Sequence, residues 1–395
     1  MSWKEVTAVA ERKRFMELWE QEGRPSVAQL CREFDISRKT GYKWISRYRL
    51  HGEAGLQELP RASHTHPNAI SDEIEELVIQ ARHAHPSWGA KKLLPWLQRK
   101  HPRRRDWPCV ASVSSILERN QLVRARKRRR LVEPFAGQLT QAERPNDLWC
   151  IDHKGWWMAT NGDKCEPFTV TDHASRYLIR CALRRGKGID YVRPVLNAAF
   201  CEYGLPLAIR SDNGPPFASR APLGLSELSV WFLRLGICHE RIEAGNPQQN
   251  GRHERMHLTM QIDKGPGQAS SLGAEQKRLN AWREEFNTQR PHEALGLATP
   301  HECYLASPRA MPRRLPELEY SSTMRVRKID ISGKLCWRGR DVFVTEALRG
   351  QQLGLEPTNH DGLWTLWFGR MILGIFDERR LHIRWAKHPK LGQAD

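Results

Sequence analysis

The sequence predicts a multidomain protein with all-α helix-turn-helix domains at the N-terminus, an α/β core in the middle and a small β-barrel at the C-terminus. Three observations support this prediction. At 395 residues the chain exceeds a typical single domain, so two to four domains are expected. Apolar residues recur at helical spacing before about residue 145 and gather in strand-like runs after it. From residue 320 onward they alternate with polar residues between glycine turns.

Residues 1–56 are the first predicted domain, a helix-turn-helix unit that binds DNA. A helical periodicity covers 5–22, and two shorter helices within 26–52 flank a turn ending at Ser37, which can cap the second of them. The residues of that second helix expected to face inward are Tyr42, Trp44 and Ile45. Its exposed side, near the end that contacts DNA in such motifs, carries the predicted DNA-binding residues Arg38, Lys39, Thr40 and Lys43. The alternative is an ordinary helical hairpin with solubilising charges.

A linker over 57–70, rich in Pro, Ser and His, leads to a second predicted helical DNA-binding domain over 71–123. Ser71 stands where an N-cap is expected, and acidic residues fill the first turn after it. A later helix over 109–123 offers hydroxyl groups for phosphates at Ser112, Ser114 and Ser115. The basic linker over 124–144 adds predicted DNA contacts at Arg124, Arg126, Lys127, Arg128, Arg129 and Arg130. A solvated linker is the alternative for this last segment.

The charge of the chain predicts its partner. A net charge of +18 and a pI near 9.8 attract polyanions at long range, and double-stranded DNA is the expected one. No apolar run of 18 residues is present, so no membrane partner is expected. The nine cysteines are scattered without a C-x-x-C pair, which suits a reducing cytosol and disfavours a zinc-finger site. We therefore expect a cytoplasmic protein that binds DNA.

The predicted core over 145–310 contains carboxylates at places where a sheet would bring them together. Strands are expected over 147–157, 166–183 and 205–212, with a helix over 189–204 between the last two. Asp152 lies inside the first strand, and Asp212 closes a later strand at a turn. For a third acid, Glu240, Glu243 and Glu254 compete. Glu254 is preferred because only it lies past the turn, on a helix that can lean back over the sheet.

These acids predict a metal site. A charged group inside a strand is expensive unless something pairs with it. Three carboxylates without a Cys or His cluster beside them favour Mg²⁺ or Mn²⁺, and two such ions can clamp the attacking and departing oxygens of a phosphodiester. The alternative is that Asp152 pairs with a basic side chain near it.

The ordered motifs of the chain resemble a known family. They are SRKTGYKWISRY, GLQELPRA, HPSWGAKKLLPWL, DLWCIDHKGWW, RSDNGPPFAS, NPQQNGRHERMH and FNTQRPHEALGLATP. Together they resemble the DDE-type transposases of bacterial insertion sequences, in particular the family named for insertion sequence 481, whose catalytic core is similar to that of retroviral integrases. The resemblance implies a ribonuclease H-like core and an acidic triad of Asp152, Asp212 and Glu254 that binds two divalent metal ions.

The resemblance also implies roles for the residues around the acids. Asn213 and Gly214 would shape the turn of the second acid, and Gly251 the approach to the third. Arg290, Pro291 and His292 match a turn after the triad, where a structural role and a DNA contact are both open. The chain departs from the pattern in two ways. The stretch between Asp212 and Glu254, 41 residues long, exceeds the usual length, and Gln261 stands where a basic residue is common.

The function implied is that of a DNA transposase. It would bind the terminal inverted repeats of a mobile element, cleave a DNA strand and join its 3′ end to target DNA, as a homo-oligomer assembled on DNA. Two alternatives differ in class. One is a helix-turn-helix regulator with an inactive core, and the other is a ribonuclease H-like nuclease without strand transfer.

Overall fold

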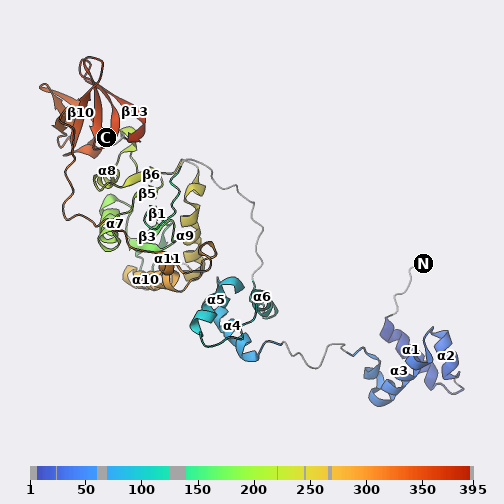
Figure 1. Ribbon diagram of the computed structural model, residues 1–395. Helices are drawn as coiled ribbons and strands as arrows, with labels where there is room; N and C mark the ends of the chain where they lie inside the picture. The colour runs from blue at the N-terminus through green and yellow to red at the C-terminus, as the bar shows by residue number, and fades with distance from the viewer. Residues whose placement is uncertain are drawn as a thin grey trace. The chain divides into compact units, whose positions relative to one another are not determined.

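The computed structural model describes residues 7–23, 25–59, 69–123, 139–219, 221–243, 246–265 and 269–391. The chain divides into two compact units, Met1–Ala69 and Ile70–Asp395, and each is described by itself (Figure 1). No helix of the described residues is long and apolar enough to cross a membrane.

The first unit is a bundle of short helices. They are α1 (Ala8–Glu20), α2 (Val27–Glu33), α3 (Arg38–His51) and the 3₁₀ turn η1 (Gly52–Leu56). The Ser37 hydroxyl accepts from the Thr40 N–H, which confirms the predicted cap of α3. A Cβ added at Gly41 would lie 2.4 Å from Cys31 Sγ, so α2 and α3 meet closely there. Trp44 and Ile45 are buried, but Tyr42 is 58% exposed, so its predicted inward orientation is wrong.

The second unit opens with α4 (Asp72–Ala84), α5 (Ala90–Lys100) and α6 (Val110–Arg119), which share a core of Val78, Leu93 and Ile116. The Ser71 hydroxyl accepts from Ile74 N–H, as predicted for an N-cap. On α6 the hydroxyls of Ser114 and Ser115 donate to carbonyls one turn earlier in their own helix. Both hydroxyl protons are therefore already in use.

The core is a mixed sheet whose middle strands carry the first two acids. Its strands are β1 (Leu148–His153), β2 (Trp157–Met158), β3 (Lys164–Asp172), β4 (Leu178–Arg184), β5 (Ala208–Ser211) and β6 (Cys238–Arg241). The strand order is β2-β3-β1-β5-β6, with β4 beside β3. β1 pairs antiparallel with β3 and parallel with β5. Because β1 and β5 are parallel neighbours, their carboxyl ends meet at the same edge.

Helices cover both faces of this sheet (Figure 1). They are α7 (Ile189–Tyr203), α8 (Glu227–Arg234), α9 (Gly251–Lys264), α10 (Leu272–Thr288) and α11 (Pro300–Cys303), with the 3₁₀ turns η2 (Pro222–Gly224), η3 (Pro247–Asn250) and η4 (Glu293–Leu295). α7 and α8 pack Phe200 and Phe232 against Trp149 of β1. α9 and α10 pack Met256 and Trp282 on the other face.

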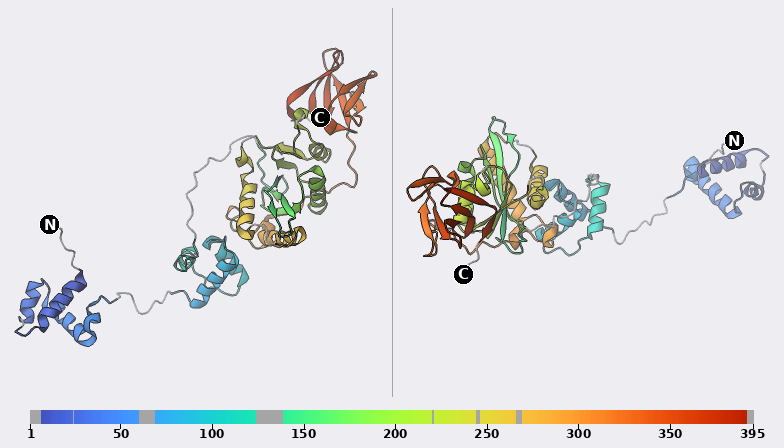
Figure 2. Two further views of the ribbon diagram at one scale, coloured as in Figure 1. Left: turned by 180° about the vertical axis from the view of Figure 1, so that it is seen from behind. Right: turned by 90° about the horizontal axis from the view of Figure 1, so that it is seen from above.

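The C-terminal region forms two sheets (Figure 2). Its elements are β7 (Arg325–Lys328), β8 (Lys334–Trp337), β9 (Arg340–Phe343), η5 (Glu346–Leu348), β10 (Gln352–Pro357), β11 (Leu363–Phe368), β12 (Met371–Asp377) and β13 (His382–Leu391). Five strands pair in the order β13-β12-β11-β10-β7, while β8 and β9 form a separate hairpin. The small β-barrel predicted over 320–385 is therefore not confirmed. The alternation of polar and apolar residues shows only that one face of each strand is buried. Two open sheets bury one face each just as a barrel does, so the pattern does not distinguish them.

Polar contacts join the helices α4 and α5 to α10 and to the segment that precedes α11. His85 Nδ1 lies 3.0 Å from Glu285 Oε1 of α10, and Arg99 donates to the carbonyl of Leu297 at 2.8 Å. Arg290, which is buried, pairs with Asp263 at 3.0 Å. This pairing favours the structural alternative for the Arg290 turn.

Candidate metal centre

Asp152 lies near the carboxyl end of β1 rather than in its middle, and its side chain is 24% exposed. The β1–β3 register sets it opposite Thr169. Within the described residues, no Lys or Arg nitrogen lies within 4.0 Å of its carboxylate. Its one ion-pair partner there is a histidine, His257, whose Nδ1 is 3.8 Å from Asp152 Oδ2. Lys154 lowers the pKa of Asp152 through its charge, but it makes no direct ion pair with this carboxylate.

Asp212 follows β5 directly, at the same sheet edge as Asp152. Its Oδ1 is buried and has no hydrogen-bond partner among the described residues. The Asn213 side chain donates to the carbonyl of Ile242 and so fastens the turn to the end of β6. A Cβ at Gly214 would lie 3.1 Å from Asp212 Oδ2, tight enough to displace that carboxylate. A buried oxygen without a donor is what a cation ligand requires.

Glu254 projects from the first turn of α9 and is exposed. It lines a cleft of about 500 Å³ together with Asp152, Gly251, His257 and Gln261. A Cβ at Gly251 would meet nothing within 4 Å, so this residue leaves open space at the mouth of the helix.

The charges of Asp212 and Glu254 both act on Asp152, although the three carboxylates are not among the described groups whose ligand atoms all lie within 4.8 Å of one another. Burial and the charge of Asp212, with a further contribution from Glu254, raise this pKa from 3.8 to about 7. A divalent cation beside Asp152 would offset both its burial and the charges of these two neighbours.

The competing acids have other partners. Glu240 Oε2 pairs at 3.0 Å with Arg210, and both side chains are mostly buried. Arg210 also donates to the carbonyls of Thr140 and Gln249, at 3.0 and 3.2 Å. The Glu243 carboxylate accepts from Asn246 within its own turn. Glu240 is therefore committed to a buried ion pair, and Glu254 stays our preferred third acid.

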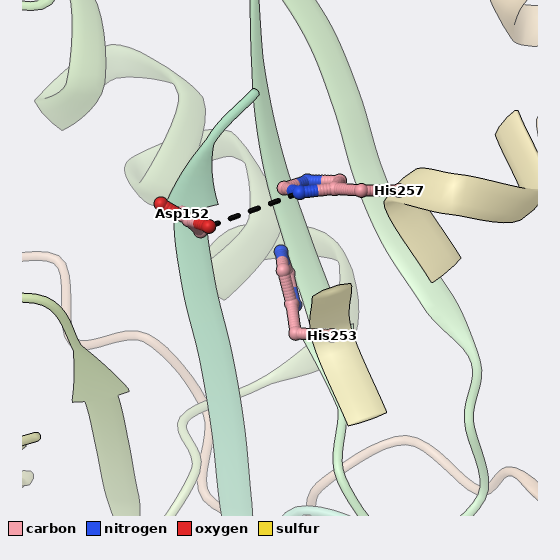
Figure 3. A group of neighbouring side chains, drawn as sticks. All are labelled: Asp152, His253 and His257. Carbon is pink, nitrogen blue, oxygen red and sulfur yellow. Dashed lines mark ion pairs between the residues drawn. The ribbon is translucent and has the colours of Figure 1, made fainter. Parts of the chain in front are cut away.

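Two histidines stand beside Asp152, so the prediction of no His cluster near the acids is wrong (Figure 3). His253 and His257 are buried on α9, on either side of Glu254 in sequence. Burial lowers the pKa of His253 well below 6.5, and burial together with Lys154 lowers that of His257 to about 3. The motif HERMH carried the signal, because histidines four residues apart share one helix face and H-E-x-x-H is a spacing typical of metal-binding helices.

The predicted DNA-binding residues fall into two groups. Arg38, Lys39 and Lys43 are exposed along α3, and the Thr40 hydroxyl bonds that of Ser37 at 2.9 Å. The basic residues of 124–130 lie outside the described residues.

Comparison with known families gives several matches. An integrase core domain matches residues 142–247, and a second integrase core model matches 235–300. A helix-turn-helix domain matches 11–64 and a homeodomain-like domain 40–117, which confirms the predicted type of N-terminal region. The C-terminal domain of IS481 family transposases matches 324–383.

Relatives come from mobile elements. The insertion element IS476 uncharacterized 39.2 kDa protein of Xanthomonas euvesicatoria is 28% identical over 239 residues, 59% of this chain and 65% of the relative. The insertion element IS407 uncharacterized 31.7 kDa protein of Burkholderia multivorans is 31% identical over 181 residues, 46% of this chain and 63% of the relative. The matches thus span slightly less than two thirds of each relative. A structure of the HTLV-2 integrase catalytic core domain in complex with magnesium is 18% identical, covering 42% of this chain and 100% of that one with a TM-score of 0.31.

The matched domains and the sheet define a class of protein, one with a ribonuclease H-like integrase core behind helix-turn-helix domains. The C-terminal match is to the C-terminal domain of IS481 family transposases, and the relatives to which the chain is similar are insertion-element proteins.

Proposed function

We propose that this protein is a DNA transposase of the DDE type. It binds the terminal inverted repeats of an insertion sequence, cleaves a DNA strand and transfers the freed 3′ end to target DNA. One observation carries the proposal: Asp152, Asp212 and Glu254 come from three separate elements, and the charges of Asp212 and Glu254 both raise the pKa of Asp152.

The residues at this edge suit a hard divalent cation. The unpartnered Asp212 Oδ1 and the raised pKa of Asp152 support Mg²⁺ or Mn²⁺, two ions in number, held by the three acids. Such ions, when bound, stabilise charge on the attacking and leaving oxygens of a phosphodiester. Asn213 and Gly214 hold the Asp212 turn, and Gly251 keeps the approach to Glu254 open. A water molecule and then a 3′ hydroxyl serve as nucleophiles, so the chain contributes positioning and needs no covalent intermediate.

DNA binding is assigned to the helical domains and the basic segment after them. The exposure of Arg38, Lys39 and Lys43 at the start of α3, with Thr40 beside them, supports this assignment, because helix-turn-helix modules meet the major groove with that part of the second helix. The arginines and lysine of 124–130 add phosphate contacts, as the net charge of +18 favours. Two element ends must be joined, so we propose a homo-oligomer on DNA.

The test is a cleavage and joining assay on DNA duplexes that carry the ends of the element. The full chain should nick them only when Mg²⁺ or Mn²⁺ is present, and should join pre-cut ends to a second duplex. Asp152→Asn should abolish both activities and leave DNA affinity within about twofold, since the helical domains are unchanged.

The same assay separates the alternatives. Nicking without joined product from pre-cut ends would favour a nuclease. Specific binding without metal-dependent nicking would favour a regulator with an inactive core. A parallel loss of binding in Asp152→Asn would contradict the catalytic role given to this residue.

A further inference from the structure

The Thr169 hydroxyl fixes how the two histidines carry their protons. It donates its one proton to the backbone carbonyl of Asp152, at 3.2 Å. His253 Nε2 and His257 Nε2 each lie 2.7 Å from the same hydroxyl oxygen. The hydroxyl has a single proton and two lone pairs, so while that proton is on the Asp152 carbonyl both ring nitrogens are the donors. Each neutral ring therefore carries its proton on Nε2 and a lone pair on Nδ1.

The two Nδ1 atoms differ in what they face. His253 Nδ1 lies 2.7 Å from the Thr171 hydroxyl, which can donate to it. Both nitrogens of His253 are thus occupied, and this ring is a structural link between β3 and α9. His257 Nδ1 has no hydrogen-bond partner among the described residues and faces Asp152 Oδ2, as Figure 3 shows. His257 is 4% exposed, yet it lines the cleft that contains Glu254.

A lone pair and a carboxylate oxygen 3.8 Å apart are spaced to share a cation between them. The distance is too long for a direct hydrogen bond, and two acceptors repel when nothing positive separates them. Ligand atoms about 2.1 Å from a shared ion lie about 3 to 4 Å apart, which matches the observed separation. The separation of the two ligand atoms thus suits a shared metal ion, and a proton on Nε2 leaves the Nδ1 lone pair to face it.

We propose that His257 Nδ1 is a nitrogen ligand that joins Asp152 in holding one divalent cation, and that Thr169 is the positioning residue that keeps this nitrogen available. The proposal rests on the proposed function, because it concerns a cation of the same cleft. It has a consequence for metal choice. An imidazole favours transition metals over Ca²⁺ and Mg²⁺, so the site should prefer Mn²⁺ beyond what carboxylates alone provide.

The test uses the full chain with Mn²⁺ alone and a spectroscopic readout. Electron spin-echo modulation of bound Mn²⁺ should show coupling to ¹⁴N, and this coupling should change to the ¹⁵N pattern when the protein is labelled with ¹⁵N-histidine. His257→Ala should remove the coupling and weaken Mn²⁺ binding by about tenfold or more, while Ca²⁺ binding falls less than about threefold. His83→Ala, an exposed histidine on α4, is the matched control and should change neither value.

Thr169 gives a second test through the tautomer. Thr169→Val keeps the side-chain shape but removes the acceptor for both rings, and should lower the affinity for Mn²⁺ more than that for Ca²⁺. Thr169→Ser keeps the hydroxyl and should restore the parent preference. If Thr169 acted in folding alone, its replacement would lower the affinities for Mn²⁺ and Ca²⁺ by the same factor, and Thr169→Ser and Thr169→Val would give the same metal preference.

The outcomes separate this proposal from the proposed function. Mn²⁺ that binds in an Asp152-dependent way without nitrogen coupling would overturn the His257 proposal and leave the acidic site intact. Absence of any Asp152-dependent Mn²⁺ binding would count against the metal site itself. The labelled parent protein alone shows whether any histidine nitrogen is bound to Mn²⁺, and the His257 and Asp152 variants assign that nitrogen and the site.

Discussion

Removing the charge of Asp152 should stabilise the metal-free protein in a pH-dependent way. The carboxyl pKa rises from 3.8 to about 7 in the folded chain, so the folded state binds more protons than the unfolded state between these values. Stability therefore falls as pH rises through this window, and the full cost, about 4 kcal/mol, is present above pH 7. Asp152→Asn removes this cost. The free energy of unfolding of the variant should exceed that of the parent only slightly near pH 4 and most at pH 8.

The measurement is thermal unfolding of the full chain in EDTA from pH 4 to pH 8. For a unit the size of the core, about 4 kcal/mol corresponds to a melting temperature higher by about 10 °C at pH 8, as an upper value. Asp361→Asn removes an exposed acid of a C-terminal turn and serves as the control for charge alone. Mn²⁺ should then raise the melting temperature of the parent more than that of the Asp152 variant.

Equal slopes of melting temperature against pH in the parent and Asp152→Asn would refute the reasoning. That result would mean that neither burial nor the charges of Asp212 and Glu254 raise the pKa of Asp152 in the folded chain. A variant that is less stable at pH 8 would point instead to hydrogen bonding by the ionised carboxylate.

Three further expectations concern the scaffold, the DNA contacts and the cleft. Arg210→Ala leaves a buried carboxylate unpaired and should cost about 3–5 kcal/mol, measured by urea unfolding; a loss below 1 kcal/mol would contradict it. Lys39→Ala with Lys43→Ala should lower the salt dependence of DNA binding by about one unit of slope per lost phosphate contact, whereas Lys13→Ala on α1 should not. Gly251→Ala should leave the free energy of unfolding unchanged or raise it by up to about 1 kcal/mol, because the added Cβ enters open space. The same methyl group should reduce cleavage by narrowing the approach to Glu254, and unchanged cleavage would contradict the role given to Gly251.

Local signals in the sequence were sufficient to predict where the helices α3 and α4 begin. Ser37 and Ser71 cap helices through their own hydroxyls, and the partner of each is three residues away. The placement of Asp212 after a strand followed equally from a local turn signal. The orientation of Tyr42 could not be predicted in this way, because helical periodicity does not decide whether a residue at the edge of the apolar face is buried. In the packed helix α3 this ring is exposed to solvent.

The histidine cluster depends on contacts that sequence spacing cannot reveal. The HERMH motif predicts two histidines on one helix face, but their partners, Thr169 and Thr171, lie more than 80 residues earlier on β3. Only the register of β1 and β3 shows that Thr169 stands opposite Asp152. The tautomer of His257, and with it the chemistry of the ring, is fixed by tertiary structure. The motif alone would favour zinc binding by both histidines, which the occupied nitrogens of His253 argue against.

Glu254 is exposed, so its place in the site must come from what holds its helix. Two buried polar networks flank the start of α9. On one side Thr169 binds both histidines of the helix to β1 and β3. On the other side Arg210, two residues before Asp212, donates to the carbonyl of Gln249 in η3, the turn that leads into the helix. Each network connects one aspartate strand to the same helix, so a flexible glutamate can meet two fixed aspartates without being buried itself. Weakening either network should therefore lower metal affinity before it unfolds the core.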